Sequence, residues 1–177
     1  MTTVEIAVLG LIAEKPRHGY EIDAVIEERG MRNWTDIGFS SIYSALKRLE
    51  KAGLVTGQVQ YQEPAPPKKV YHITAKGQEE LKSQVARLLS APKRPISEFD
   101  LGVANLPVLS KTEVIEHLRA YLSILEERIS FLEKAAQEMA QAPFFVLGLF
   151  TRPLAHSRIE RDWVRGFVEE IESQPDW

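Results

Sequence analysis

The strongest constraint on the fold is a change in the spacing of apolar residues at Gly53. Before this glycine they recur in steps of three and four, which predicts helices, whereas short β-branched and aromatic runs after it predict strands. Three helices followed by two strands with a protruding loop between them predict a winged helix-turn-helix. The predicted elements are helices up to Lys15, at 19–28 and at 42–52, and strands at 54–61 and 70–74.

Residues that start and stop helices support these boundaries. Ser40 or Ser41 is a natural N-cap for the third helix, and Gly53 suits the position just after its end. Thr74 is expected to cap a fourth helix that runs to about Ala91. Four helices and a small hairpin therefore account for the first half of the chain.

A proline-rich segment, Pro92–Pro95, is the best candidate for a domain boundary. It divides the chain into a winged helix-turn-helix domain, residues 1–92, and a second domain, residues 93–177, whose periodicity predicts helices throughout. The predicted fold class is thus mainly α with a small β wing, in which the winged helix-turn-helix is followed by a helical dimerisation domain.

Two long segments dominate the second domain. Ser110 and Glu113 are spaced as a capping box that opens a helix reaching to about Ala140. A final helix ends near Glu172, and Pro153 is expected to kink or interrupt the region before it. A short amphipathic piece at 96–105 precedes both.

The long helix carries a seam of apolar residues that alternates in steps of three and four. Such a seam favours pairing with a second copy of the chain, since a single long helix with few companions cannot cover the apolar stripe alone. It is also compatible with an intramolecular core. The candidate dimerisation residues are Ile115, Leu118, Leu122, Leu125, Ile129 and Leu132, joined by Trp163 and Phe167 of the final helix.

Aromatic side chains gather just after the long helix. Phe144, Phe145 and Phe150 are candidates for lining an effector pocket at the dimer interface. The alternative interpretation is that they form ordinary interface core, because aromatic residues dominate helical interfaces.

Composition excludes several classes of site. The chain has no cysteine, so it has no disulfide, no thiolate metal site and no cysteine nucleophile. Its four histidines lack metal-ligand spacing, and no glycine-rich phosphate loop is present, so we expect no metal and no cofactor. No apolar run reaches the ~20 residues of a membrane span. Together these features predict a cytoplasmic protein with no membrane partner.

The second helix of the helix-turn-helix is expected to lie in the major groove of double-stranded DNA. Its exposed face carries hydroxyls and cations, which suit phosphates and base edges, although such residues also occur on ordinary solvated helices. The prolines of segment 63–69 are expected to keep it out of any strand ladder, which places two lysines on the wing. The candidate DNA-binding residues are Ser40, Ser41, Tyr43, Ser44, Lys47, Arg48 and Lys51, with Lys68 and Lys69 on the wing.

Several segments across residues 4–89 also resemble the PadR-like transcriptional regulators in order and spacing, and the helical second half resembles the longer subgroup with a virulence-activator-like tail. The resemblance implies a homodimeric repressor that a small-molecule effector releases from its operator. It also implies DNA contacts by Tyr20, Ser41, Tyr43 and a wing lysine. The matching segments are Leu9–Ile12, Pro16–Ile22, Ser41–Glu50, Gly53–Val55 and Lys69–Thr74 with Gly77.

Two other functions remain open at this point. A winged helix can be a protein-interaction module without ligand-regulated DNA binding, and in that event the cations of the third helix would be irrelevant to DNA. An enzyme built from scattered residues is the other alternative, and it requires a convergent acid–base pair in the folded chain.

Overall fold

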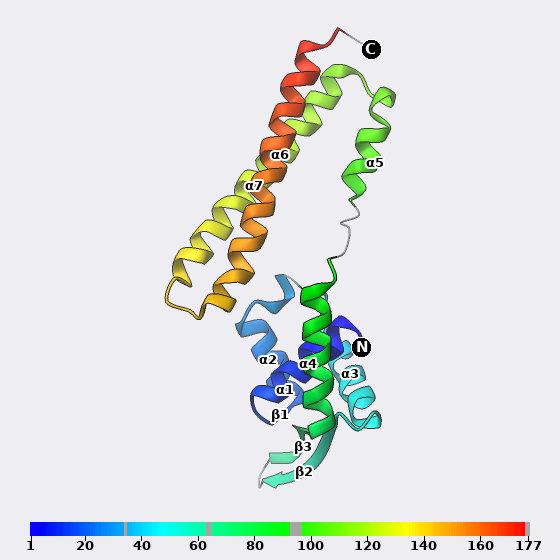
Figure 1. The fold of residues 1–177 in the computed structure, drawn as a ribbon, viewed down its shortest axis with the longest axis vertical. Helices are drawn as coiled ribbons and strands as arrows, with labels where there is room; N and C mark the ends of the chain where they lie inside the picture. The colour runs from blue at the N-terminus through cyan, green and yellow to red at the C-terminus, as the bar shows by residue number, and fades with distance from the viewer. Residues whose placement is uncertain (34, 63–64, 93–96, 176–177) are drawn as a thin grey trace. The chain divides into compact units, whose positions relative to one another are not determined.

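The computed structural model describes residues 1–33, 35–62, 65–92 and 97–175, and it divides the chain into two compact units, Met1–Arg94 and Pro95–Trp177. The predicted boundary at Pro92–Pro95 lies largely outside the described residues. Each unit has its own hydrophobic core. Figure 1 shows that helices and a small sheet make up the first, whereas the second is helical.

The first unit contains the predicted helices and hairpin together with a short extra strand (Figure 1). All strand pairs are antiparallel, and the longest strand lies between the other two in the order β1-β3-β2. A single 3-10 turn, Met31–Asn33, lies between α2 and α3. The elements are α1 (Thr3–Glu14), β1 (Arg17–His18), α2 (Gly19–Glu28), α3 (Phe39–Lys51), β2 (Val55–Gln62), β3 (Ala65–Ile73) and α4 (Ala75–Ser90).

Helix α3 begins at least two residues earlier than its predicted caps allow. Gly38, in extended conformation, is the N-cap and makes no side-chain capping bond, so the assignment of Ser40 or Ser41 as the cap is wrong. Ser41 instead donates its hydroxyl back to the Gly38 carbonyl at 2.5 Å. The first turn gains a different support, because the rings of Phe39 and Tyr43 lie 5.1 Å apart one turn from each other.

Glycine ends α3 as predicted. Gly53 has φ +70°, a left-handed conformation in which a side chain is strained. The cap of α4 is also confirmed, since the Thr74 hydroxyl accepts from the Gly77 backbone N–H at 3.0 Å.

The core of the first unit forms where α1, α2 and α3 meet. The apolar stripe of α3 lies almost wholly out of solvent, and each of its isoleucine and leucine side chains contributes roughly 1.5–3 kcal/mol through burial. Its buried residues are Ile42, Ala45, Leu46 and Leu49. This burial fixes which face of α3 points away from the core, and so it positions the candidate site.

The sheet departs from the sequence prediction in two ways. Strand β1 was not expected, and it pairs with the end of β3 through Arg17↔Tyr71 and His18↔Val70. Lys68 and Lys69 lie within β3 rather than on a loop, opposite Gln60 and Val59 of β2. Prolines are tolerated in this part of β3 because β1 does not extend along it, so one side of the strand needs no N–H donors, and the ladder is irregular at Gln60/Gln62.

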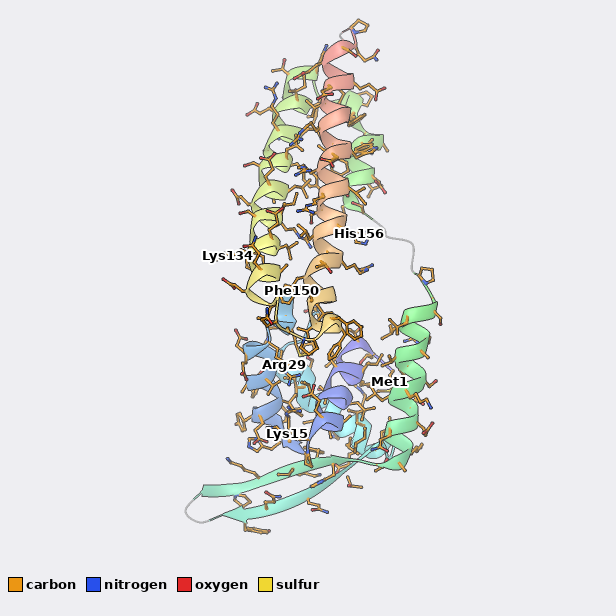
Figure 2. All side chains as sticks on the ribbon, turned by 60° about the vertical axis from the view of Figure 1, so that its left-hand side comes forward. Met1, Lys15, Arg29, Lys134, Phe150 and His156 are labelled. Atoms are coloured by element: carbon orange, nitrogen blue, oxygen red, sulfur yellow. The ribbon has the colours of Figure 1, made fainter. Side chains whose placement is uncertain are left out.

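The second unit is built on a helical hairpin. Figure 2 shows α6, which carries Lys134, alongside α7, which carries Phe150 and His156. A 3-10 turn, Leu106–Val108, leads into α6, and the predicted Ser110 cap is confirmed because its side chain accepts from the Glu113 N–H. The helices are α5 (Glu98–Ala104), α6 (Lys111–Glu138) and α7 (Phe144–Ser173).

Pro153 lies inside α7, which continues through it, so the predicted interruption is wrong. Proline removes one helical hydrogen bond and costs about 3 kcal/mol in an isolated helix. Packing offsets this cost, because the next residue, Leu154, is buried against Ile129 and Leu132 of α6.

The apolar seam of α6 is largely covered by α7 of the same chain. Val114 and Leu118 form one cluster with Val164, Val168 and Ile171. The intramolecular alternative accounts for the buried part of the seam, and a place for these residues in a dimer interface stays a prediction. The residues concerned are Leu118, Leu125, Ile129 and Leu132, whereas Ile115, Leu122 and Phe167 are half-buried and Trp163 is exposed.

An ion-pair cluster at the end of α1 makes the stability of the first unit depend on pH. The Glu14 carboxylate accepts from Arg29 at 2.6 and 2.9 Å and from the buried Arg17 at 3.0 Å. The hydrogen bond from Arg29 is the main cause that lowers the pKa of Glu14, while burial acts in the opposite direction and Arg17 adds to the lowering.

We expect the Glu14 contribution to be fully present above the ordinary carboxyl pKa and to be lost as the pH falls through the lowered pKa of the folded state. Glu14→Gln should therefore lower the urea midpoint of unfolding at pH 6. It should also make the midpoints at pH 6 and pH 3.5 more alike than they are in wild type. Glu79→Gln, which removes an exposed carboxylate of α4, should leave both midpoints near wild type. A Glu14→Gln protein with the same pH profile as wild type would contradict the assignment.

Candidate nucleic-acid interface

The face of α3 opposite the core is a polar and cationic surface. Because Ile42, Leu46 and Leu49 are buried, the residues one to two positions away in each turn point into solvent. The predicted residues lie on this face as expected, except that Ser41 is half-buried. The exposed ones are Ser40, Tyr43, Ser44, Lys47, Arg48 and Lys51.

The three cations of α3 differ in their partners. Arg48 Nε donates to Glu5 Oε1 of α1 at 2.5 Å, and the Arg48 side chain is still half exposed. Within the described residues, Lys47 and Lys51 take part in no ion pair. These two lysines can therefore bind an anion directly. Arg48 must first release the Glu5 carboxylate.

The hairpin adds two further cations beside α3. Lys69 Nζ lies 2.7 Å from Glu50 Oε2 of α3 and 5.4 Å from the centre of the Tyr71 ring. The hydrogen bond to Glu50 raises the pKa of Lys69. Lys68 is exposed on the same strand. The wing thus touches α3 through an ion pair, which no local sequence pattern predicts.

An aromatic cluster stands at the junction of α2 and α3. Tyr20 lies 5.9 Å from Phe39 and 6.2 Å from Tyr43 between ring centroids. His18 lies at the edge of this cluster and caps α2 by accepting from the Glu21 N–H at 3.2 Å, so this histidine has a structural role. Tyr20 is 67% exposed, so it is available for contact despite its packing against the neighbouring rings.

Gly19 explains how closely Tyr43 approaches α2. A Cβ atom at position 19 would lie only 2.7–2.9 Å from carbons and oxygen of the Tyr43 ring. Burial, followed by the neighbouring Tyr20, raises the pKa of Tyr43. Its phenol therefore keeps its proton near neutral pH and can donate a hydrogen bond.

Phe39 is the member of the cluster that sequence reasoning missed. It is the first residue of α3, it is 46% exposed, and it packs on both tyrosines. Its spacing of four from Tyr43 was the available signal, since residues four apart in a helix are neighbours. The signal was lost because the helix was expected to begin after the serines.

The aromatic residues proposed for an effector pocket line neither of the two cavities described in their unit. Phe144 and Phe145 are 86% and 64% exposed, because they lie in the first turn of α7 beside the loop that ends α6. Phe150 is half-buried. An open cavity of about 410 Å³ lies elsewhere in the unit and is lined by Ser97, Tyr121, Leu125, Arg128, Arg152, Pro153, His156, Ser157 and Glu160.

Metal-binding clusters and membrane-spanning helices are both absent from the described residues. These residues contain no group of three or more histidine, aspartate or glutamate side chains placed to hold a metal ion. No helix among them combines the length and apolar character that crossing a bilayer demands.

Comparison with known proteins shows that the first unit is similar to a family of regulators. Residues 8–83 match the model of the Transcriptional regulator PadR-like family. The negative transcriptional regulator PadR of Bacillus subtilis is 27% identical over 139 residues, which cover 78% of this chain and 76% of that protein. The matched span includes all of α2, α3 and the hairpin.

Solved structures share the fold of the whole chain. Bacillus subtilis PadR in complex with operator DNA has a TM-score of 0.80 at 23% identity, covering 96% of this chain and 99% of that one. The same protein with p-coumaric acid has a TM-score of 0.81 at 24% identity, covering 97% and 100%. The Vibrio cholerae virulence activator AphA has a TM-score of 0.71 at 15% identity, covering 97% and 99%. The winged helix followed by a helical unit is thus a known arrangement.

Proposed function

We propose that the chain is a PadR-like transcriptional regulator, whose family model matches residues 8–83, and that it is a homodimeric repressor that binds a palindromic operator in double-stranded DNA. Residues 1–92 are the DNA-binding domain and residues 93–177 the dimerisation and effector domain. We infer further that it is not an enzyme and that it acts in the cytoplasm.

The observation that carries this proposal is the outward face of α3. Helix-turn-helix proteins place the N-terminal part of the second helix against base edges in the major groove. In this chain that part presents Ser40, Tyr43 and Ser44, and the next turns present Lys47 and Lys51 without acidic partners among the described residues. Hydroxyls near base edges and cations near phosphates are the contacts that DNA recognition requires.

A second copy of the chain is the partner that the helical unit fits best. Ile124 and Phe131 are 62% and 59% exposed on α6, and Ile159 and Trp163 are 70% and 52% exposed on α7. Each pair is spaced by a multiple of about one helical turn, so each forms an apolar stripe. Stripes of this kind on a two-helix hairpin are covered when two hairpins combine.

Two heads held by such a dimer would bind half-sites one helical turn apart, or a multiple of it, roughly 10 bp. Regulation by a small molecule follows from the same arrangement, provided that the ligand prefers one spacing of the heads. The Bacillus subtilis relative has been crystallised with p-coumaric acid. The 410 Å³ cavity of this chain is within the size range of ligand sites, and Arg128, Arg152 and His156 lie on its wall.

Salt-dependent binding tests the proposal. The purified protein would be titrated onto DNA from upstream of its own gene, onto a scrambled sequence of the same length, and at several salt concentrations. We expect tighter binding to the upstream DNA than to the scrambled sequence. We also expect the logarithm of the affinity to fall linearly with the logarithm of the salt concentration, because phosphate contacts release counterions. Binding that depends on neither sequence nor salt would overturn the proposal.

Glu50 is expected to restrain DNA binding. Its carboxylate holds Lys69 at 2.7 Å and adds negative charge beside the proposed surface. Because an exposed ion pair of this kind contributes about 0.2–1 kcal/mol, Glu50→Gln should tighten binding by ~1.5- to 5-fold at low salt.

The matched control is Glu79→Gln, which removes the same charge from an exposed position on α4 that makes no ion pair among the described residues. Fluorescence anisotropy at two salt concentrations would compare both variants with wild type. Equal gains in the two variants would mean that net charge alone is responsible and that the Lys69 pair plays no part.

A further inference from the structure

An exposed hydrocarbon ring stands at the start of α3, amid polar residues. Phe39 is 46% exposed, and the positions that follow it on the outward face carry hydroxyls and cations. A phenylalanine can neither donate to a phosphate nor accept from a base edge. If this ring contacts DNA, the group that it contacts must therefore be apolar.

The ring of Phe39 is held in place from several sides. Tyr43 lies 5.1 Å away and Tyr20 5.9 Å away between centroids, and those two rings contact each other at 6.2 Å. The chain enters α3 from Ile37, which is only 2% exposed. A side chain fixed in this way loses little conformational freedom when it contacts a ligand.

We propose that Phe39 recognises the C5-methyl group of a thymine in the major groove, an inference that rests on the proposed DNA-binding function. The first residues of a recognition helix are those that reach base edges, and Phe39 is residue one of α3. Among the groups that the four bases expose in the major groove, the thymine methyl is the apolar one, and apolar side chains contact it.

The neighbouring tyrosines are compatible with the same assignment. Tyr20 and Tyr43 pack against Phe39, and each carries a hydroxyl, a group that can donate to a phosphate. Phosphate contacts by the tyrosines would then set the position of the helix, and Phe39 would select the base. Each half-site would carry one such thymine, at a position related by the two-fold axis of the operator.

The experiment replaces thymine by uracil, which removes only the methyl group. Full-length protein would first select its binding sequence from a random double-stranded pool. Each thymine of the selected site would then be replaced by deoxyuridine, one symmetric pair at a time. At one pair we expect about a fourfold loss of affinity per half-site, which corresponds to ~0.8 kcal/mol for the removal of one buried methyl group.

Variants connect this effect to Phe39. In Phe39→Ala the uracil operator and the thymine operator should bind equally, while Phe39→Leu, which keeps an apolar side chain, should retain part of the discrimination. Phe144→Ala removes the same side chain from an even more exposed position, 86%, in the other unit, and it should discriminate as wild type does. Thermal unfolding of all variants checks that they fold.

Three outcomes would overturn the inference, and they are distinguishable from failure of the proposed function. If uracil at every position leaves the affinity of wild type unchanged, Phe39 makes no methyl contact, even though the protein has selected a sequence. Equal uracil penalties in wild type and Phe39→Ala assign the methyl to another residue. The third outcome is that Phe39→Ala loses affinity at a pyrimidine–purine step to the same extent whether the base is thymine or uracil. That result would indicate that Phe39 inserts between bases as a wedge. If the pool yields no preferred sequence at all, the DNA-reading function itself fails.

Discussion

Replacing Lys47 and Lys51 together by alanine is expected to weaken binding to the selected operator about 100-fold or more at moderate salt. Both lysines point out of α3, and neither has an acidic partner among the described residues. A hydrogen bond to a charged group contributes about 1.5–3 kcal/mol, so removing two of them gives a change of this size. The slope of log affinity against log salt should also fall, by about one for each phosphate that a DNA-binding head no longer neutralises.

A matched pair of lysines separates local contact from net charge. Lys82 on α4 and Lys134 on α6 are exposed and make no ion pair among the described residues, and Figure 2 labels Lys134 on its helix. The variant Lys82→Ala/Lys134→Ala changes the net charge by the same amount and should bind only a few-fold more weakly than wild type. Anisotropy titrations of both double variants over a range of salt concentrations would supply the comparison.

The same measurement decides between the proposed DNA-binding function and the protein-interaction module that the sequence left open. A protein-interaction module would not depend on Lys47 and Lys51 for its DNA affinity, so an unchanged double variant would favour that alternative. Arg48→Ala offers an internal check. Because Arg48 is already paired with Glu5, its removal should change the salt slope less than the removal of Lys47 does.

The outward face of α3 could be predicted because it follows from a local pattern. Ile42, Leu46 and Leu49 recur at helical spacing, so they fix both the helix and the side on which Lys47 lies. The left-handed Gly53 and the Thr74 cap are local as well. Local rules of this kind need no knowledge of the rest of the fold.

The parts that escaped prediction depend on residues far apart in the sequence. Strand β1 forms because Arg17 and His18 pair with Tyr71 and Val70 at the end of β3. Two residues are too few to show a periodic pattern that would predict a strand. The ion pair between Lys69 and Glu50 depends on how the hairpin meets α3. Both features follow from tertiary pairing that overrides local propensity.

The apolar seam of α6 shows a second limit. Leu118 and Leu125 have the spacing of a coiled-coil seam, and that spacing is the same whether the partner is α7 or another chain. What decided the outcome is the length of α7, which continues through Pro153 and therefore reaches far along α6. The proline favoured a shorter helix, and the burial of Leu154 outweighed it.

A buried glycine that joins α4 to the end of α3 underlies the second large expected effect. Gly77 lies in the first turn of α4, and a Cβ atom there would sit 2.1 Å from the Leu54 carbonyl oxygen and 2.9 Å from the Ile73 side chain. Thr74 holds this turn in place, since its backbone N–H donates to the Leu54 carbonyl at 3.0 Å and its hydroxyl donates to the Gly53 carbonyl at 2.8 Å. Helix α4 cannot move away without breaking these bonds.

Gly77→Ala is therefore expected to destabilise the first unit by about 2–4 kcal/mol, in the range of strong overpacking. The control is Gly10→Ala in α1 of the same unit, where a Cβ atom meets nothing within 4 Å. There the same substitution should stabilise by roughly 0.5–1 kcal/mol, because alanine favours the helix more than glycine does. Urea unfolding followed by circular dichroism would measure both.

The central prediction is that Gly77→Ala lowers the free energy of unfolding whereas Gly10→Ala raises it. Helix propensity acts equally at both positions, so the difference between the variants isolates the close approach of α4 to the turn after α3. That turn leads directly into β2, and a displaced α4 would thus also shift the hairpin that brings Lys69 to Glu50. Stabilisation by Gly77→Ala, equal to that by Gly10→Ala, would mean that the junction has room for a methyl group and that the wing is not fixed to α3 in this way.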